Sequence, residues 1–405
     1  MESTLTFSDL LNACTQGGPS VMTSVTELSA AAGTHASITP AKFVEGKSSV
    51  FSFETRYIDG EPVETVMIDS IPSSANRGES AIVRDIMAGN KVLVRIPRIE
   101  LAYGNRVFSD MDLSHRYTDG HIRAGKYEDK PVTDAQWYKN LRDGSNRNYK
   151  ALLNTAPIAL VCGVWDSTPR SNQTRIRRAV TGETIGVLAD QTRPGAEQQG
   201  PRSGTRVDPV GASVMLDPGD FEQIVANQKA ALSAKKVKEF QDAIKKLKTG
   251  QKISGSKVGV GALPPTLDPL GGVSCSRVIR SWVVSFTALR QLNFGETAEE
   301  NIAGRALVAA LAIALVARAE QELYYRSNCD LVEVAAPEVK LDLRYGNFKN
   351  LEPLSVEGAD KLLSEAIDHA EKLGVADWHG QVKKVEGNPV IYNNAVADSE
   401  DNESN

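Results

Sequence analysis

Cysteine and histidine are scarce in this sequence, and neither is arranged for metal or disulfide chemistry. The 405 residues include four Cys, which are Cys14, Cys162, Cys275 and Cys329, and five His. The cysteines form no Cys-x-x-Cys pair, which argues against a disulfide framework and a cysteine zinc site and suits a reducing cytoplasm. His115 and His121 lie six residues apart, outside any His-Glu-x-x-His motif, so we expect no metal ion.

Recognisable catalytic and nucleotide-binding motifs are also absent. No Gly-x-Ser-x-Gly elbow occurs, and the nearest match, residues 272–276, lacks its second glycine. Residues 255–261 are rich in glycine but lack the order and the Lys-Ser/Thr ending of a phosphate-binding loop. We therefore expect neither a catalytic nucleophile nor a cofactor.

No segment has the pattern of a targeting signal or a membrane span. The first residues, MESTLTFSDLL, lack the basic start and the apolar run of a signal peptide. The longest apolar stretch, residues 306–317, lies between Arg305 and Arg318 and is too short to cross a bilayer. These patterns predict a soluble cytoplasmic protein that does not bind membranes and in which residues 306–317 form a buried helix.

Positive charge is concentrated in two parts of a chain that is acidic as a whole. The formal net charge is −5. Residues 137–206 nevertheless hold eleven Lys and Arg against five Asp and Glu, and residues 229–257 hold nine Lys against two acidic residues. Because salt screens charges over about 10 Å, a local basic region can hold a polyanion despite an acidic total.

Hydrophobic periodicity predicts strands and helices that follow one another without the regular rhythm of a parallel sheet. The predicted strands cover residues 49–57, 64–68, 91–101, 157–165, 278–289 and 331–343. The predicted helices cover residues 74–87, 112–125, 218–248, 298–326 and 355–373, and turns are predicted at residues 59–60 and 181–183. This pattern favours an α+β fold with an antiparallel sheet and large insertions.

One segment with side chains suited to phosphate is residues 70–79 (SIPSSANRGE), at the start of a predicted helix. Free N–H groups and the helix dipole attract anions to such a start. We expect Ser73 or Ser74 to cap the helix, and Asn76 and Arg77 to reach phosphate oxygens. The same residues would also suit an ordinary capped helix.

A second such segment contains Arg170, Arg175, Arg177 and Arg178. Strand alternation would place Arg175 and Arg177 on one face and Arg178 on the other. Guanidinium groups suit phosphate oxygens, and an apolar side chain such as Ile176 or Val180 could wedge between bases. A solvated basic loop would explain the same arginines.

The lysines of residues 229–257 allow two interpretations. They could follow a nucleic-acid backbone, or they could keep one helix face soluble. Because ammonium groups are compact charges without directional specificity, the sequence favours the solvated face.

Residues 70–79 resemble the S-x-x-S-x-A-N-R-x-E signature of the CRISPR-associated RAMP proteins that form the Cascade backbone in subtype I-G, formerly I-U. Further similar segments follow in the expected order. They are residues 114–116 (SHR), 163–167 (GVWDS), 183–185 (ETI) and the small-residue helix at 304–323. The Lys-rich insert and the extended termini depart from the family pattern.

The resemblance implies an RRM-like (ferredoxin-like) antiparallel core with inserted thumb and finger elements. On this interpretation, residues 1–392 form one domain. Its insertions are a thumb or loop at about residues 170–215 and a Lys-rich helical insert at about 218–272, and residues 393–405 form a disordered acidic tail.

The resemblance also implies a non-catalytic subunit that holds CRISPR RNA without reading its sequence. Its partners would be copies of itself along the guide, other Cascade subunits, and the target DNA strand that pairs with the guide in antiviral defence. The implied RNA-binding residues are Ser73, Ser74, Asn76, Arg77, His115, Arg116, Trp165, Arg170, Arg175, Arg177 and Arg178. Trp165 would stack on a base, although a core position would suit it equally.

Two other functions stay open at this point. Some RAMP relatives cut RNA, so the chain could be a metal-independent endoribonuclease that uses His115 as general acid or base. It could also be an assembly protein that binds no nucleic acid.

Overall fold

The computed structural model describes residues 2–46, 48–143, 148–166, 174–198, 211, 213–261, 271–325 and 329–393. The chain divides into two compact units. The main unit comprises residues 1–198 and 273–405, and the insert unit comprises residues 199–272.

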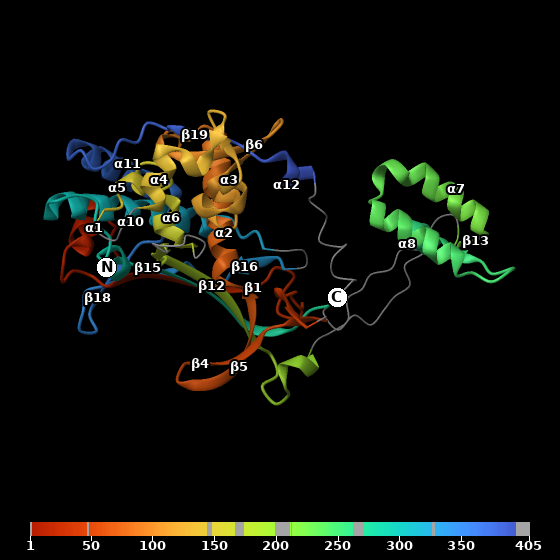
Figure 1. The fold of residues 1–405 in the computed structure, drawn as a ribbon. Coiled ribbons are helices and arrows are strands. Elements are labelled where there is room, and N and C mark those ends of the chain that lie inside the picture. The colour runs from red at the N-terminus through yellow and green to blue at the C-terminus, as the bar shows by residue number, and fades with distance from the viewer. Residues whose placement is uncertain are drawn as a thin grey trace. The chain divides into compact units, whose positions relative to one another are not determined.

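The largest sheet of the main unit is an antiparallel sheet of eight strands that lies against the helices on one side (Figure 1). The strands lie in the order β18–β17–β1–β15–β12–β5–β4, and β16 also pairs with β1. Their bounds are Val21–Ala30 (β1), Phe53–Ile58 (β4), Glu61–Asp69 (β5), Val180–Leu188 (β12), Cys275–Ser285 (β15), Leu331–Glu333 (β16), Glu338–Asp342 (β17) and Phe348–Leu351 (β18). This sheet and its helices confirm the predicted α+β class.

Six elements of the main unit follow one another as β1, α2, β12, β15, α10 and β17, where α2 spans Ile71–Met87 and α10 spans Ala298–Gln321. The four strands of this series lie side by side in the order β17–β1–β15–β12. This is the connectivity of a split βαβ, or ferredoxin-like, unit. The β4–β5 hairpin and β18 extend the sheet at its two edges.

Helices cover one face of the sheet (Figure 1). They are α1 (Phe7–Cys14), α2, α10 and α11 (Val356–Lys372). Side chains of β1 and β15 such as Met22, Trp282 and Val284 join the apolar side chains of α10 in one core. Among the described helices, α10 is long and apolar enough to cross a membrane, yet 89% of its most apolar window is buried inside the structure. Its buried position confirms the prediction for residues 306–317.

Two buried arginines fasten the helices to one another and to the sheet. Arg318 of α10 donates hydrogen bonds to Asp85 of α2 at 2.7 Å and to Asp360 of α11 at 2.9 Å. Arg280 of β15 donates to the backbone carbonyl of Glu320 at 3.3 Å and to Thr26 of β1 at 3.1 Å. Both guanidinium groups therefore have partners on neighbouring elements, as buried charge requires.

A smaller sheet lies in the segment between α2 and β12. Its strands follow the order β7–β6–β19–β8–β9, and β19, from the C-terminal part of the chain, runs parallel to β6. Their bounds are Arg98–Tyr103 (β6), Arg106–Ser109 (β7), Lys126–Tyr127 (β8), Lys130–Pro131 (β9) and Val382–Glu386 (β19). The short helices here are α3 (Gly120–Arg123), α4 (Gln136–Arg142), α5 (Lys150–Leu153) and α6 (Ile158–Cys162).

Several predicted elements are confirmed with shifted ends. The turn at Asp59 and Gly60 joins β4 to β5, and both residues have positive φ, 54° and 88°. Residues 49–57 are divided between β3 (Ser48–Phe51), which pairs with β2 (Lys42–Glu45), and β4. Residues 331–343 are divided between β16 and β17, and residues 278–289 end in the short helix α9 (Phe286–Leu289). The helix predicted at 355–373 is α11, and that predicted at 298–326 is α10.

Other predictions are wrong. The apolar run 157–165 is not a single strand, since it forms α6 and then β10 (Val164–Asp166). A short run that is buried on all sides has the same composition in a helix and in a central strand. Gly163 ends α6 with φ 79°, and a Cβ there would lie 2.8 Å from the backbone nitrogen of Arg178.

The turn predicted at residues 181–183 is also wrong, because these residues lie inside β12. Gly182 makes room for the ring of Trp282 on the adjacent strand β15. Residues 91–95 are not a strand, since a 3-10 turn (Leu93–Arg95) precedes β6. The helix predicted at residues 112–125 is not continuous. Its central part forms the 3-10 turn Arg116–Thr118 and the short helix α3.

The insert unit is a small helical hairpin with its own core. The helix predicted at 218–248 is broken into α7 (Pro218–Gln228) and α8 (Ala234–Lys245), and the two-residue strands β13 (Met215–Leu216) and β14 (Ile253–Ser254) pair beside them. The rings of Phe221 and Phe240 pack edge to face, with their centroids 5.6 Å apart. Val225, Ile253 and Val258 complete the buried cluster.

The buried carboxyl of Asp110 generates a stability prediction. Its Oδ1 accepts hydrogen bonds from the Ile99 N–H at 3.1 Å and from the Ser109 hydroxyl at 3.3 Å, whereas Oδ2 is buried and has no hydrogen-bond partner among the described residues. Burial raises the pKa of Asp110 from 3.8 to about 7. Because the folded-state pKa lies above the unfolded one, the protonated carboxyl stabilises the fold, and this contribution is lost as the pH rises from about 4 to about 7.

We therefore expect Asp110→Asn to raise the free energy of unfolding at pH 8 and to flatten its fall between pH 5 and pH 8. Urea denaturation at both pH values measures this, with the exposed Asp134→Asn as the matched control. A variant that loses stability equally at both pH values would show that Asp110 is held as an anion.

Candidate nucleic-acid interface

The first predicted segment forms the start of α2. Ser70 occupies the N-cap position without a side-chain cap bond, so the prediction that Ser73 or Ser74 caps the helix is wrong. Ser74 is buried and donates to Asp69 Oδ2 at 2.8 Å. Pro72 explains the earlier start, because proline suits the first turn of a helix.

Arg77 of this segment is engaged within the chain. Its Nε donates to Asp69 Oδ2 at 2.9 Å, and its Nη2 lies 2.5 Å from Asp69 Oδ1. Its Nη1 donates to the carbonyl of Tyr324 at 2.6 Å, and the guanidinium lies 4.8 Å from the ring centroid of Tyr325. Arg77 thus joins the end of β5 to the segment after α10.

A shallow groove of about 260 Å³ runs beside this arginine. It is lined by Ser73, Asn76, Arg77, Ser80, Arg84, Ala319, Glu322 and Tyr324. Asn76 and Arg84 are exposed, and 75% of Tyr324 is accessible to solvent. The groove therefore presents amide, hydroxyl, guanidinium and aromatic groups along one face of α2.

Arg116 joins residues 114–116, the second segment of the family resemblance, to residues 70–79, the first. Its Nε and Nη2 donate to the two carboxylate oxygens of Glu79 on α2 at 2.6 and 2.8 Å. Its Nη1 donates to the carbonyl of Gly163 at 3.1 Å. Residues 79, 116 and 163 come from three different segments of the resemblance, and one side chain joins them.

We call this contact of Arg116 with Glu79 and Gly163 the Arg116 clamp, and it carries an energetic cost because its charged groups are buried. Only 1% of Glu79 is exposed, and burial raises the pKa of its carboxyl while the neighbouring guanidinium opposes that shift. Arg116 also has a positive φ of 53°, which costs about 1–2 kcal/mol for a residue with a Cβ. The fold keeps the clamp despite that backbone strain.

His115 lies next to the clamp but takes no part in it. It is exposed, and its backbone N–H donates to Asp119 at 3.1 Å. Within the described residues its imidazole has no carboxylate partner. His121, which the sequence spacing links to it, is 2.8 Å from the hydroxyl of Tyr103 instead.

Residues 163–167, the third segment of the resemblance, contain β10. This strand pairs with β11 (Thr174–Ile176) in a two-stranded ribbon, and one face of the ribbon is exposed. Trp165 and Arg175 are paired across the ribbon, and the guanidinium lies 5.0 Å from the centroid of the indole. Trp165 is 63% exposed, so it is not a core tryptophan. This Trp165–Arg175 pair offers an aromatic plane flanked by positive charge.

The basic segment continues past β11. Arg175 and Arg177 are exposed and Ile176 between them is buried, which is the alternation that the sequence predicted. Neither Arg177 nor Arg178 has a carboxylate partner among the described residues. The suggested wedges are wrong, because Ile176 and Val180 are both buried in the core. Arg170 lies outside the described residues.

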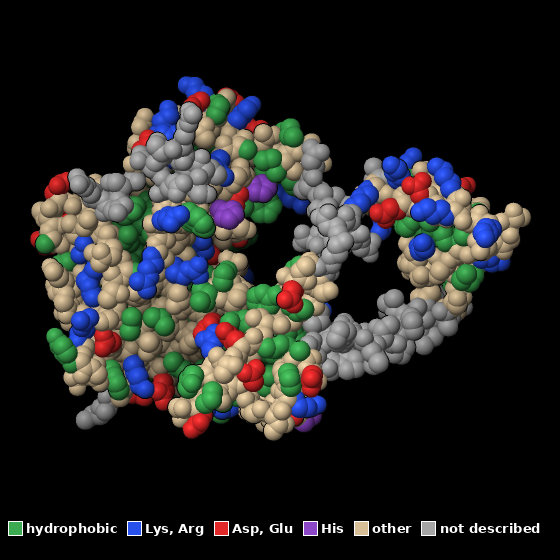
Figure 2. Space-filling model, turned by 60° about the horizontal axis from the view of Figure 1, so that its bottom comes forward, with side chains coloured by type: hydrophobic (Ala, Val, Ile, Leu, Met, Phe, Trp, Pro, Cys, Tyr) green, Lys and Arg blue, Asp and Glu red, His purple; other side chains and the backbone are tan. Residues whose placement is uncertain are grey.

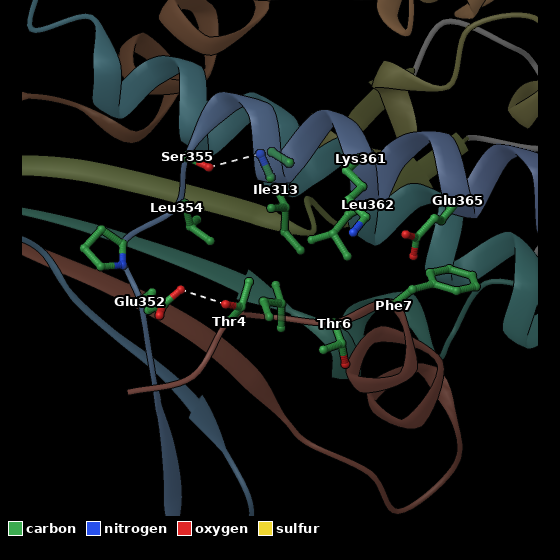
Figure 3. Close-up of a pocket in the computed structure, with 14 residues that line it drawn as sticks. Thr4, Thr6, Phe7, Ile313, Glu352, Leu354, Ser355, Lys361, Leu362 and Glu365 are labelled. Atoms are coloured by element: carbon green, nitrogen blue, oxygen red, sulfur yellow. Dashed lines mark hydrogen bonds between the residues drawn. The ribbon is translucent and has the colours of Figure 1, made fainter. Parts of the chain in front are cut away.

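Figure 2 shows Lys and Arg side chains spread over the visible face of the main unit, and several of them lie close together beside hydrophobic side chains. A separate pocket of about 490 Å³ lies between the N-terminal segment and α11 (Figure 3). Thr4 donates to Glu352 at 2.7 Å on its rim, and Phe7, Ile313 and Leu362 contribute apolar surface. None of the predicted site residues lines this pocket. Across the described ranges, no group of three or more His, Cys, Asp and Glu is arranged to hold a metal ion.

Sequence reasoning missed the partners that hold the predicted residues. Asp69 directly precedes the helix start, so its pairing with Arg77 had a local signal. Glu79 and Arg116 are far apart in the chain, and nothing in either segment alone indicates that they meet. Tyr324 and Tyr325 follow α10 without any pattern that would bring them to α2.

The Arg116 clamp predicts a large and specific loss of stability. Arg116→Met leaves the Glu79 carboxylate buried without its partner and should lower the free energy of unfolding by about 3–5 kcal/mol. Adding Glu79→Gln should restore part of the loss, because the uncompensated charge is then removed. Urea denaturation measures both variants, and the exposed control Arg84→Ala should change stability by less than about 0.5 kcal/mol. Equal losses in the single and double variants would contradict a buried charge pair.

Comparison with known proteins places the clamp and the ribbon in one matched region. Residues 22–191 match the family model described as CRISPR-associated protein GSU0053. No curated protein matches the chain. The matched residues include β1 except its first residue, α2, the Arg116 clamp, the β10–β11 ribbon and β12. Over this region, which is less than half of the chain, the protein is similar to the family described as CRISPR-associated protein GSU0053.

Proposed function

We propose that the main unit holds guide RNA as a non-catalytic backbone subunit of a type I Cascade complex of subtype I-G. The observation that carries the proposal is the Trp165–Arg175 pair, exposed on a ribbon within the CRISPR-associated match. Exposed aromatic planes beside positive charge are the usual means of binding single-stranded nucleic acid without sequence preference.

The cations beside this pair suit the same task. Arg177 is exposed, Arg178 is partly exposed, and neither is neutralised by a carboxylate in the described part of the chain. Guanidinium forks bind phosphate oxygens and carry no information about the bases. The ribbon and the residues just after it therefore have both groups that a sequence-independent grip needs, a stacking plane and phosphate donors.

The two engaged arginines receive a different role. Arg77 and Arg116 donate most of their hydrogen bonds to carboxylates and carbonyls of the chain. We assign them to shaping the wall of the groove, and we assign direct RNA contact to exposed neighbours such as Asn76 and His115. Ser73 lies on the same wall, whereas the buried Ser74 supports it from behind.

The connectivity of the sheet supports the RRM-like part of the proposal. The strand order β17–β1–β15–β12 with α2 and α10 as crossovers is the order of the ferredoxin-like unit. Copies of the chain would lie along one CRISPR RNA with other Cascade subunits, and the unstacked bases would pair with a target DNA strand. The complex would act in the cytoplasm.

Trp165→Ala should weaken the binding of single-stranded RNA about tenfold or more, because base–aromatic stacking contributes about 1–3 kcal/mol. Fluorescence anisotropy with two labelled RNAs of unrelated sequence measures this. Trp165→Phe is the matched control and should keep most of the affinity. An unchanged affinity for Trp165→Ala would remove the observation on which the proposal rests.

The double variant Arg177→Ala with Arg178→Ala should weaken binding to all RNA sequences alike. It should also reduce the slope of log K against log salt by about 0.7 for each phosphate that the protein no longer neutralises. A loss confined to one RNA sequence would indicate base reading and would argue against a backbone grip.

The non-catalytic part of the proposal has its own test. Purified protein incubated with its repeat RNA should leave the RNA length unchanged on a denaturing gel. Cleavage that disappears in His115→Ala would establish the endoribonuclease alternative. Protein from its native operon should carry RNA of uniform length, and protein free of nucleic acid would favour the assembly alternative.

A further inference from the structure

The insert unit differs in charge from the rest of the chain. Residues 199–272 contain eleven of the 46 Lys and Arg residues of the sequence. They contain only seven of the 51 Asp and Glu residues. The insert unit is therefore basic and the remainder is acidic. A solvated helix needs charge of either sign, so solubility alone does not explain why one sign is gathered here.

The positive charge lies on the face of α8 that points away from the core of the insert unit. Phe240 packs against Phe221 on the inner face. Lys238, Lys245 and Lys246 are exposed, and Lys248 follows just after the helix. Lys238 and Lys245 are two helical turns apart, which is about 10 Å along the axis.

Most of these lysines have no acidic partner in the part of the chain that the structure describes. Lys238, Lys246 and Lys248 have no carboxylate partner among the described residues. The pair between Lys245 and Asp242 is long, 3.8 Å, and largely exposed. Such surface pairs contribute about 0–1 kcal/mol and can exchange for a phosphate.

The side chains of this face suit phosphate contacts better than stacking on bases. The insert unit contains only two aromatic residues, Phe221 and Phe240, and both are buried. No arginine occurs in its described part. Binding of a single strand adds aromatic stacking to charge, whereas the bases of a double helix are paired and stacked inside, so sequence-independent contacts to its outside are made to phosphates.

We propose that the lysine face of α8, with Lys238, Lys245, Lys246 and Lys248, binds the phosphate backbone of a nucleic-acid double helix without sequence preference. This site is distinct from the RNA grip of the main unit and does not depend on it. A double helix can be duplex DNA or a guide–target hybrid, which share this phosphate surface.

The test uses the full chain with four lysines of the insert unit changed together, K238Q, K245Q, K246Q and K248Q. The matched control removes the same number of charges from exposed positions of the main unit, K42Q, K91Q, K361Q and K372Q. Labelled 20-base-pair DNA, an RNA–DNA hybrid of equal length and single-stranded RNA are titrated at several KCl concentrations. Circular dichroism checks that both variants stay folded.

The insert variant should bind duplex DNA or the hybrid at least tenfold more weakly at low salt, with a salt slope smaller by about 0.9 for each DNA phosphate that it no longer neutralises. Its affinity for single-stranded RNA should change less than twofold. Weaker binding to both helices indicates recognition of the double helix in general, and weaker binding to one identifies the source.

Three results would overturn the proposal. They are the absence of binding to either double helix by the unmodified protein, a fall in duplex affinity as large in the control as in the insert variant, and an equal fall in the affinity of the insert variant for single-stranded RNA. Failure of single-stranded RNA binding in every protein, with duplex binding intact, would instead refute the guide-RNA function and leave this site standing.

Discussion

The contact between Glu79 and Arg116 is the constraint on which the candidate interface depends. It joins α2 to the segment before α3, and through the carbonyl of Gly163 it also holds the end of α6. The β10–β11 ribbon starts directly after that glycine. Since a buried ion pair is stable only when both partners are present, the position of the ribbon is tied to that of α2.

This arrangement changes the meaning of a short basic motif. Arginines in motifs shared with nucleic-acid-binding proteins are often interpreted as ligand contacts, yet here Arg77 and Arg116 are bound to carboxylates of the same chain. Exposed Trp165 and Arg175 lie on the ribbon, and Arg177 lies just beyond it; neither arginine has a carboxylate partner in the described part of the chain. The arginines of a motif can thus hold the protein structure around a binding site, while exposed residues outside the motif contact the ligand.

Local patterns predicted the features that depend on local physics. The alternation of residues 175–177, the positive-φ turn at Asp59 and Gly60, and the amphipathic α11 followed from spacing and turn chemistry. The apolar run before Gly163 was misread because burial on every side removes the periodicity that separates a helix from a strand. Gly182 was misread as a turn residue because its role, leaving room for Trp282, is a contact between two strands distant in the chain. The Arg116 clamp is of the same kind, since no pattern within one segment encodes its partner.

The chain leaves the main sheet at the end of β12, before the insert unit, and returns to it at the start of β15, after the insert unit. Leu188, near the start of the insert unit, is paired with Cys275, near its end, on the adjacent antiparallel strands β12 and β15. Two chain positions held this close can be joined by a tight turn or by a whole folded unit, because closing a longer loop adds only a slowly growing entropy cost. The sheet is therefore indifferent to what is inserted there, and this position can gain, lose or exchange a module over evolution without any change in the strand pairing around it.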